Sequence, residues 1–76
     1  MFNTKSKKAK KEIEMIFNDI QINLENNYKD LAISARKKAE ERLEEFKDLG
    51  ELSSKDYERL KKRLDEYTQR MVGYHH

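Results

Sequence analysis

Apolar residues between positions 9 and 24 recur at the spacing of a helical face, and they occupy two sides of that helix. The main stripe predicts an amphipathic helix over residues 9–25, while Met15 and Ile22 lie on the opposite side. Ile33 extends this second line if the helix continues without a break. A helix that is apolar on two faces needs two neighbours. The candidate interaction face therefore consists of Ile13, Met15, Ile16, Phe17, Ile20, Ile22, Leu24 and Ile33.

A second helix is predicted over residues 27–49, because apolar residues again follow one helical face and charged residues fill the other. Opposite charges four residues apart, such as Arg36 with Glu40, are expected to add about 0.2–0.5 kcal/mol each. These ion pairs contribute more to the solubility of the outer helix face than to the stability of the fold. The predicted core positions of this helix are Tyr28, Leu31, Ala32, Ala35, Ala39, Leu43, Phe46 and Leu49.

The junction between these two helices is open to two interpretations. Asn27 followed by Asp30 has the form of a helix N-cap, and asparagine tolerates the left-handed backbone that often ends a preceding helix. Against a break, the apolar stripe keeps its phase across the junction, since Ile13, Leu24 and Ala35 are spaced by elevens. The first two helices are therefore either separate or one long helix.

Residues 47–57 contain the clearest turn in the chain. Gly50 can end the second helix in a left-handed conformation, and Ser53 with Asp56 forms a capping box that starts the third. Leu52 and Tyr57 occupy the positions of a hydrophobic staple. The third helix, over residues 53–72, carries a heptad-like seam of Tyr57, Leu60, Leu64, Tyr67, Met71 and Tyr74.

These elements predict an all-α fold: an antiparallel helical hairpin with an additional N-terminal helix. If the first two helices are separate, the chain closes as a three-helix bundle. If they are continuous, the long first helix enters an intertwined dimer. Either way the chain is a single domain, because 76 residues are close to the lower limit for one hydrophobic core.

The segment RLEEFKDLGELSSKDYERLKKRL, within residues 40–66, resembles the short C-terminal (SHOCT) domain. That family consists of small helical hairpins at the ends of bacterial and archaeal proteins. The resemblance covers about a third of the chain and implies a role in oligomerisation or attachment. The matching positions are Leu43, Phe46, Gly50, Leu52, Tyr57, Lys61 and Leu64.

Composition narrows the classes of function. Charged residues make up 42% of the chain but nearly cancel to a net charge of +2, which is unlike a polycation that coats nucleic acid. There is no cysteine, so disulfides cannot stabilise the small core. Self-association is therefore favoured as an additional source of stability. No apolar run approaches the roughly 20 residues of a membrane helix. A soluble, cytoplasmic protein that does not enter a membrane is expected.

No combination of nucleophile, base, carboxylate pair or metal ligands predicts catalysis, and no cofactor is expected. His75 and His76 form only a terminal pair, whereas metal sites recruit three or four ligands. Residues 1–8 form a basic arm that is expected to fray. The lysines here and just beyond it are spread around every side of a helix, and they are the candidate nucleic-acid contacts: Lys5, Lys7, Lys8, Lys10 and Lys11.

The sequence therefore predicts a non-enzymatic helical protein that acts in protein–protein interaction or oligomerisation. Its expected partner is a second copy, with a dimer favoured, or a larger protein. One alternative is a small nucleic-acid-binding regulator that uses the lysine cluster. Another is a small modulator that docks onto a larger enzyme.

Overall fold

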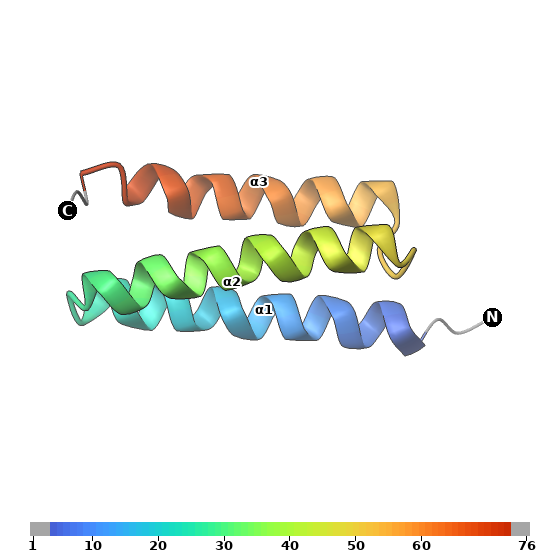
Figure 1. Cartoon of the computed structure of the whole chain (residues 1–76), viewed down its shortest axis with the longest axis horizontal. Helices are drawn as coiled ribbons and strands as arrows, with labels where there is room; N and C mark the ends of the chain where they lie inside the picture. The colour runs from blue at the N-terminus through green and yellow to red at the C-terminus, as the bar shows by residue number, and fades with distance from the viewer. Residues whose placement is uncertain (1–3, 74–76) are drawn as a thin grey trace.

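The computed structural model describes residues 4–73 and shows a three-helix bundle. The helices are α1 (Thr4–Glu25), α2 (Lys29–Asp48) and α3 (Ser54–Arg70). Successive helices run in opposite directions and form a rod of 44 × 17 × 15 Å (Figure 1). The all-α prediction is confirmed. Tyr74, His75 and His76, which entered the sequence predictions, lie outside the described residues.

The chain breaks between α1 and α2, so the three-helix alternative holds. Asn27 adopts a left-handed backbone with φ of 61°. The amide of Tyr28 donates to the carbonyl of Asn23 at 2.8 Å, and the amide of Asn27 donates to that of Leu24 at 3.1 Å. This pair of bonds is a Schellman motif, which ends a helix and satisfies its last carbonyl groups. Asn27 thus ends α1, while Tyr28 occupies the N-cap of α2 without a side-chain cap.

The turn between α2 and α3 repeats this device with glycine. Gly50 has φ of 73°, and the amide of Glu51 donates to the carbonyl of Phe46 at 2.9 Å. Ser53 then caps α3, because its hydroxyl oxygen accepts from the amide of Asp56 at 3.1 Å. The predicted roles of Gly50 and Ser53 are confirmed. Leu52 beside them is buried, which anchors the connection to the core.

One hydrophobic core runs the length of the bundle. Its largest fully buried side chains come from all three helices: Ile13, Phe17, Ile20, Leu43, Leu60 and Leu64. Ala32 and Ala39 are also fully buried, and such small side chains let helices approach closely. The ring of Phe17 lies 5.5 Å from that of Tyr67, centroid to centroid, which joins α1 to α3. The main apolar stripe of α1 is therefore consumed inside the chain's own core.

Three details differ from the sequence predictions. Helix α1 begins at Thr4, so residues 4–8 of the predicted arm are helical. Leu31 is exposed because it lies one residue, or about 100°, from the buried Ala32 stripe. Tyr28 and Leu49 are exposed because they sit at the N-cap and C-cap of α2, where the chain leaves the bundle's packed length.

Two isoleucines on α1 test this assignment of faces. Ile13 is 0% exposed and Ile22 is 45% exposed. Ile13→Ala is expected to lower the free energy of unfolding by about 2–5 kcal/mol, because it removes buried methyl groups and leaves a cavity. Ile22→Ala serves as the matched control and should change it by only about 0.5 kcal/mol. Chemical denaturation followed by circular dichroism measures both, and equal losses would contradict the fold.

Candidate interaction surface

The structure divides the predicted interaction face into two groups. Most of its members are buried or partly buried in the intramolecular core: Ile13, Ile16, Phe17, Ile20, Leu24 and Ile33. The first four are fully packed and cannot reach a partner while the chain is folded. Only Met15, at 62%, and Ile22, at 45%, are exposed large apolar side chains on α1. The candidate face is therefore much narrower than the sequence suggested, because one apolar stripe of α1 already has its neighbours.

Exposed side chains run along the whole outer edge of α1 at alternating spacings of three and four residues. That spacing keeps residues on one side of a helix. We call this row the outer seam, and it consists of Lys8, Lys11, Met15, Asn18, Ile22 and Glu25, every one of them exposed. A shallow hollow of about 270 Å³ lies along its middle, lined by Lys11, Glu14, Met15, Asn18 and Asp19.

Polar contacts hold the flank of α1 that faces α2. The Arg42 guanidinium forms a two-pronged contact with the Glu12 carboxylate, in which Nη2 donates to Oε1 at 3.1 Å. The same guanidinium donates to Glu45 at 3.2 Å and stacks over Phe46, 4.4 Å from the ring centroid. Hydrogen bonding and charge from Arg42 lower the pKa of Glu12 below its usual value, against partial desolvation.

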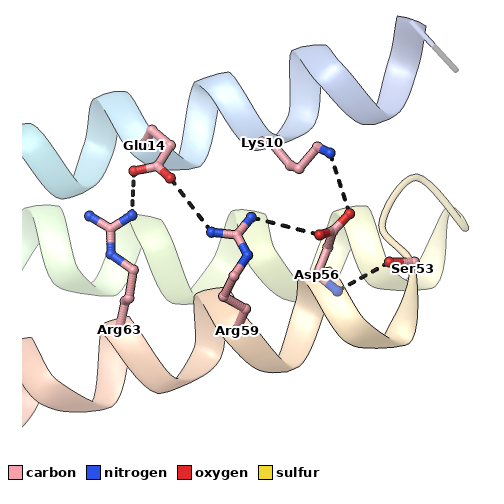
Figure 2. Close-up of polar contacts among 6 residues, drawn as sticks. All are labelled: Lys10, Glu14, Ser53, Asp56, Arg59 and Arg63. Atoms are coloured by element: carbon pink, nitrogen blue, oxygen red, sulfur yellow. Dashed lines mark hydrogen bonds and ion pairs between the residues drawn. The ribbon is translucent and has the colours of Figure 1, made fainter. Parts of the chain in front are cut away.

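A second set of contacts holds the opposite flank of α1 against α3 (Figure 2). The Glu14 carboxylate accepts from Arg63 at 2.5 Å and lies 3.9 Å from Arg59. One turn earlier, the Lys10 ammonium lies 3.4 Å from the Asp56 carboxylate. Partial desolvation acts to raise the pKa of Asp56, but Lys10 and the Ser53–Asp56 contacts outweigh it and lower that pKa. Both flanks of α1 are thus occupied, and only its outer seam faces away from the bundle.

The five candidate lysines separate in the same way. Lys10 is paired with Asp56, whereas Lys5, Lys7, Lys8 and Lys11 are exposed and have no ion pair among residues 4–73. The buried side of this stretch carries Ala9 instead. Lys7, Lys8 and Lys11 lie on the outer half of α1. Lys5 stands eleven residues, or about three turns, before the buried Ile16 and so lies nearer the inner side, at the exposed start of the helix. No acidic residue lies in the first turn of α1 to offset them.

The turn between α2 and α3 forms a depression lined by Lys47, Leu52, Ser54, Tyr57 and Glu58. The Tyr57 hydroxyl donates to the Glu44 carboxylate. That hydrogen bond, with partial desolvation and nearby carboxylates, raises the pKa of Tyr57 to about 12, so the phenol stays protonated at neutral pH. This geometry fixes the turn against α2 and does not assemble a nucleophile with a base.

Acidic side chains on the outer part of α2 line another open hollow: Glu40, Glu41, Glu44 and Glu45, with Lys61. Arg36 lies 3.7 Å from Glu40, as their spacing predicted. Within residues 4–73, no group of three or more potential ligands is placed to hold a metal ion. Among the described helices, none has the length and apolar character to cross a membrane.

Sequence reasoning missed the polar partners that orient α1. Glu12 and Arg42 are 30 residues apart, and Glu14 and Arg63 are 49 apart. No local pattern links them, because many other arginine and glutamate pairs in the chain look equivalent. It also missed Asn18 and Glu25 as members of the outer seam. The spacing from Lys8 to Glu25 could have revealed it, but the seam is mostly polar and an apolar search does not detect it.

Acid is expected to loosen the flank that faces α2. Because the pKa of Glu12 is lower in the folded chain than its ordinary 4.5, the unfolded chain binds more protons in this range. The stabilisation from Glu12 is complete above about pH 4.5 and is lost as the pH falls through the lowered value. The thermal midpoint should fall between about pH 6 and about pH 3, and this fall should be smaller in Glu12→Gln than in the control Glu41→Gln. An identical pH dependence in both variants would contradict this account.

Comparisons with known proteins leave the chain without an assigned family. A scan against protein-family models, a search of curated proteins and a search of solved structures each found no match. The resemblance to the SHOCT hairpin therefore stays a prediction, carried by the turn around Gly50 and the leucines that flank it.

Proposed function

We propose that this chain is a non-enzymatic helical protein that acts by protein–protein interaction, and that it associates with itself. The observation that carries the proposal is the outer seam of α1, where Met15 and Ile22 are exposed on a helix whose other sides are already packed or paired. Contiguous apolar surface rimmed by polar residues marks contacts with another protein. Met15 and Ile22 lie two turns apart on one side of α1, with polar residues on either side of them.

The way α1 is held supports this role. Contacts with α2 through Arg42 and with α3 through Arg63 fix the rotation of α1 about its own axis. Ile13 and the rest of the buried stripe fix its position in the bundle. A partner would thus meet a helix that is already formed and oriented. Binding to a preorganised surface avoids the entropy cost of ordering a flexible one.

Sedimentation equilibrium over a wide range of protein concentrations tests this proposal. We expect a reversible increase in mean mass towards that of a dimer as the concentration rises. The double variant Met15→Lys with Ile22→Lys should reduce association, because it places charges in the contact. Val72→Lys is the control, since Val72 is exposed but lies outside α1. A strict monomer at about 1 mM, or equal loss in the control, would overturn the proposal.

A second candidate is binding to nucleic acid, favoured by the four exposed lysines near the start of α1 that have no ion pair within residues 4–73. Such lysines could contact phosphates, and each contact would make binding more sensitive to salt. Duplex DNA added to the same sedimentation samples at low salt tests this candidate. The absence of a shift in mass would reject it, and so would a shift that survives the replacement of all four lysines (Lys5, Lys7, Lys8 and Lys11) by alanine.

A further inference from the structure

The outer seam of α1 has opposite charges at its two ends. Its N-terminal half carries Lys8 and Lys11, with Lys5 and Lys7 beside them, and none has an ion pair among the described residues. Its C-terminal half carries Glu25, with Asp19 beside the seam. The Glu25 carboxylate accepts a hydrogen bond from the neutral side-chain amide of Gln21 at 2.8 Å. The seam is therefore positive at one end and negative at the other.

This polarity distinguishes between the ways in which two copies could meet. Two parallel seams would place Lys8 against Lys8 and Glu25 against Glu25, which is repulsive at both ends. Two antiparallel seams place the positive half of each copy against the negative half of the other. An antiparallel pair also has twofold symmetry, so it uses one surface twice and closes as a dimer. Charge complementarity thus favours a second copy in the antiparallel orientation.

The spacing of the seam also gives the register. The twofold axis can cross the outer seam at a height along α1 midway between residues 16 and 17. In that register, Lys8 of one copy faces Glu25 of the other. In the same register Lys11 faces Ile22, and Met15 faces Asn18. The lysine stem at position 11 can cover the isoleucine while its ammonium stays in water. Methionine is flexible enough to fill the shallow hollow beside Asn18. Every seam position then has a partner, and no like charges on the seam are placed in opposition.

We propose that the chain forms an antiparallel homodimer through the outer seam of α1, with Lys8 of each copy paired to Glu25 of the other. This inference rests on the proposed function, because it names the partner and the contact for the same surface. With two large apolar side chains per copy, the interface is narrow, and its affinity is expected to be weak. Because its charge pairs are exposed, the dimer should also dissociate as salt is raised.

Other exposed apolar side chains fit a second copy less well. Leu31 and Leu49 lie near opposite ends of α2, and Tyr28 and Val72 lie at chain reversals or helix ends. Only Tyr28 and Leu31 are at helical spacing, and this pair lies at the start of α2 and does not continue along the helix. The acidic hollow on α2 is closer to a complement for Lys5 and Lys7, but a contact between α1 and α2 of different copies would not use one surface twice. It would therefore produce open chains unless the rotation closed a ring.

Charge reversal tests the pairing with two exposed residues. Lys8→Glu and Glu25→Lys are each expected to weaken self-association by at least about tenfold, because each creates two repulsive contacts in the dimer. An equimolar mixture of the two variants should associate again, because every contact between unlike copies joins opposite charges. Sedimentation equilibrium measures the dissociation constants, and circular dichroism melts confirm that each variant is folded. Lys55→Glu on α3 makes the same charge change away from the seam and should leave association unchanged.

The outcomes separate this inference from the proposed function. Restored association in the mixture alone, with Lys55→Glu behaving as the original chain, supports the antiparallel seam. If both single variants dimerise as well as the original chain, self-association stands but the seam is rejected. If both lose association and the mixture does not recover it, the Lys8–Glu25 pairing is rejected. If the original chain is a monomer at every concentration, both proposals fail together.

Discussion

The left-handed backbone at Asn27 is the constraint on which the rest of the structure depends. It lets the amides of Asn27 and Tyr28 donate to the last carbonyls of α1 in a Schellman motif, so the chain reverses and α2 returns along α1. Without that reversal, the apolar stripe of α1 would continue in phase into α2 and would need another molecule to cover it. With it, Ile13, Phe17 and Ile20 are buried by the chain itself. The same turn therefore decides both how the core forms and which surface is left outside.

The turn after α2 could be predicted and the turn before it could not, for a physical reason. Gly50 and Ser53 carry chemistry that a helix interior disfavours, so their presence alone indicates an end and a start. Asn27 is only slightly unfavourable within a helix, and an apolar stripe with unbroken phase is compatible with either structure. The break is seen in the left-handed backbone of Asn27 and in the Schellman hydrogen bonds around it. Whether Leu31 lies inside or outside depends on a rotation of one residue, which periodicity alone does not determine.

The candidate surface is the side of α1 that makes no contact with the rest of the bundle. The core takes one side of α1, Arg42 of α2 takes a second, and Arg63 with Asp56 of α3 takes a third. What is left is a row of exposed residues whose charges change sign from one end to the other. The sequence identified Met15 and Ile22 as a separate line, but it could not show that the stronger apolar line was already satisfied. That knowledge depends on side-chain pairs 30 and 49 residues apart.

The reversal at Asn27 can be tested directly by a distance measurement between spin labels. The chain has no cysteine, so cysteines introduced at Lys8 and Asp48 would be labelled selectively. A large excess of unlabelled protein suppresses distances between copies. The bundle predicts a short distance, because packed helices lie about 8–10 Å apart and the start of α1 lies at the same end of the rod as the end of α2 (Figure 1). A distance near 60 Å, as expected for one continuous helix at about 1.5 Å per residue, would contradict it.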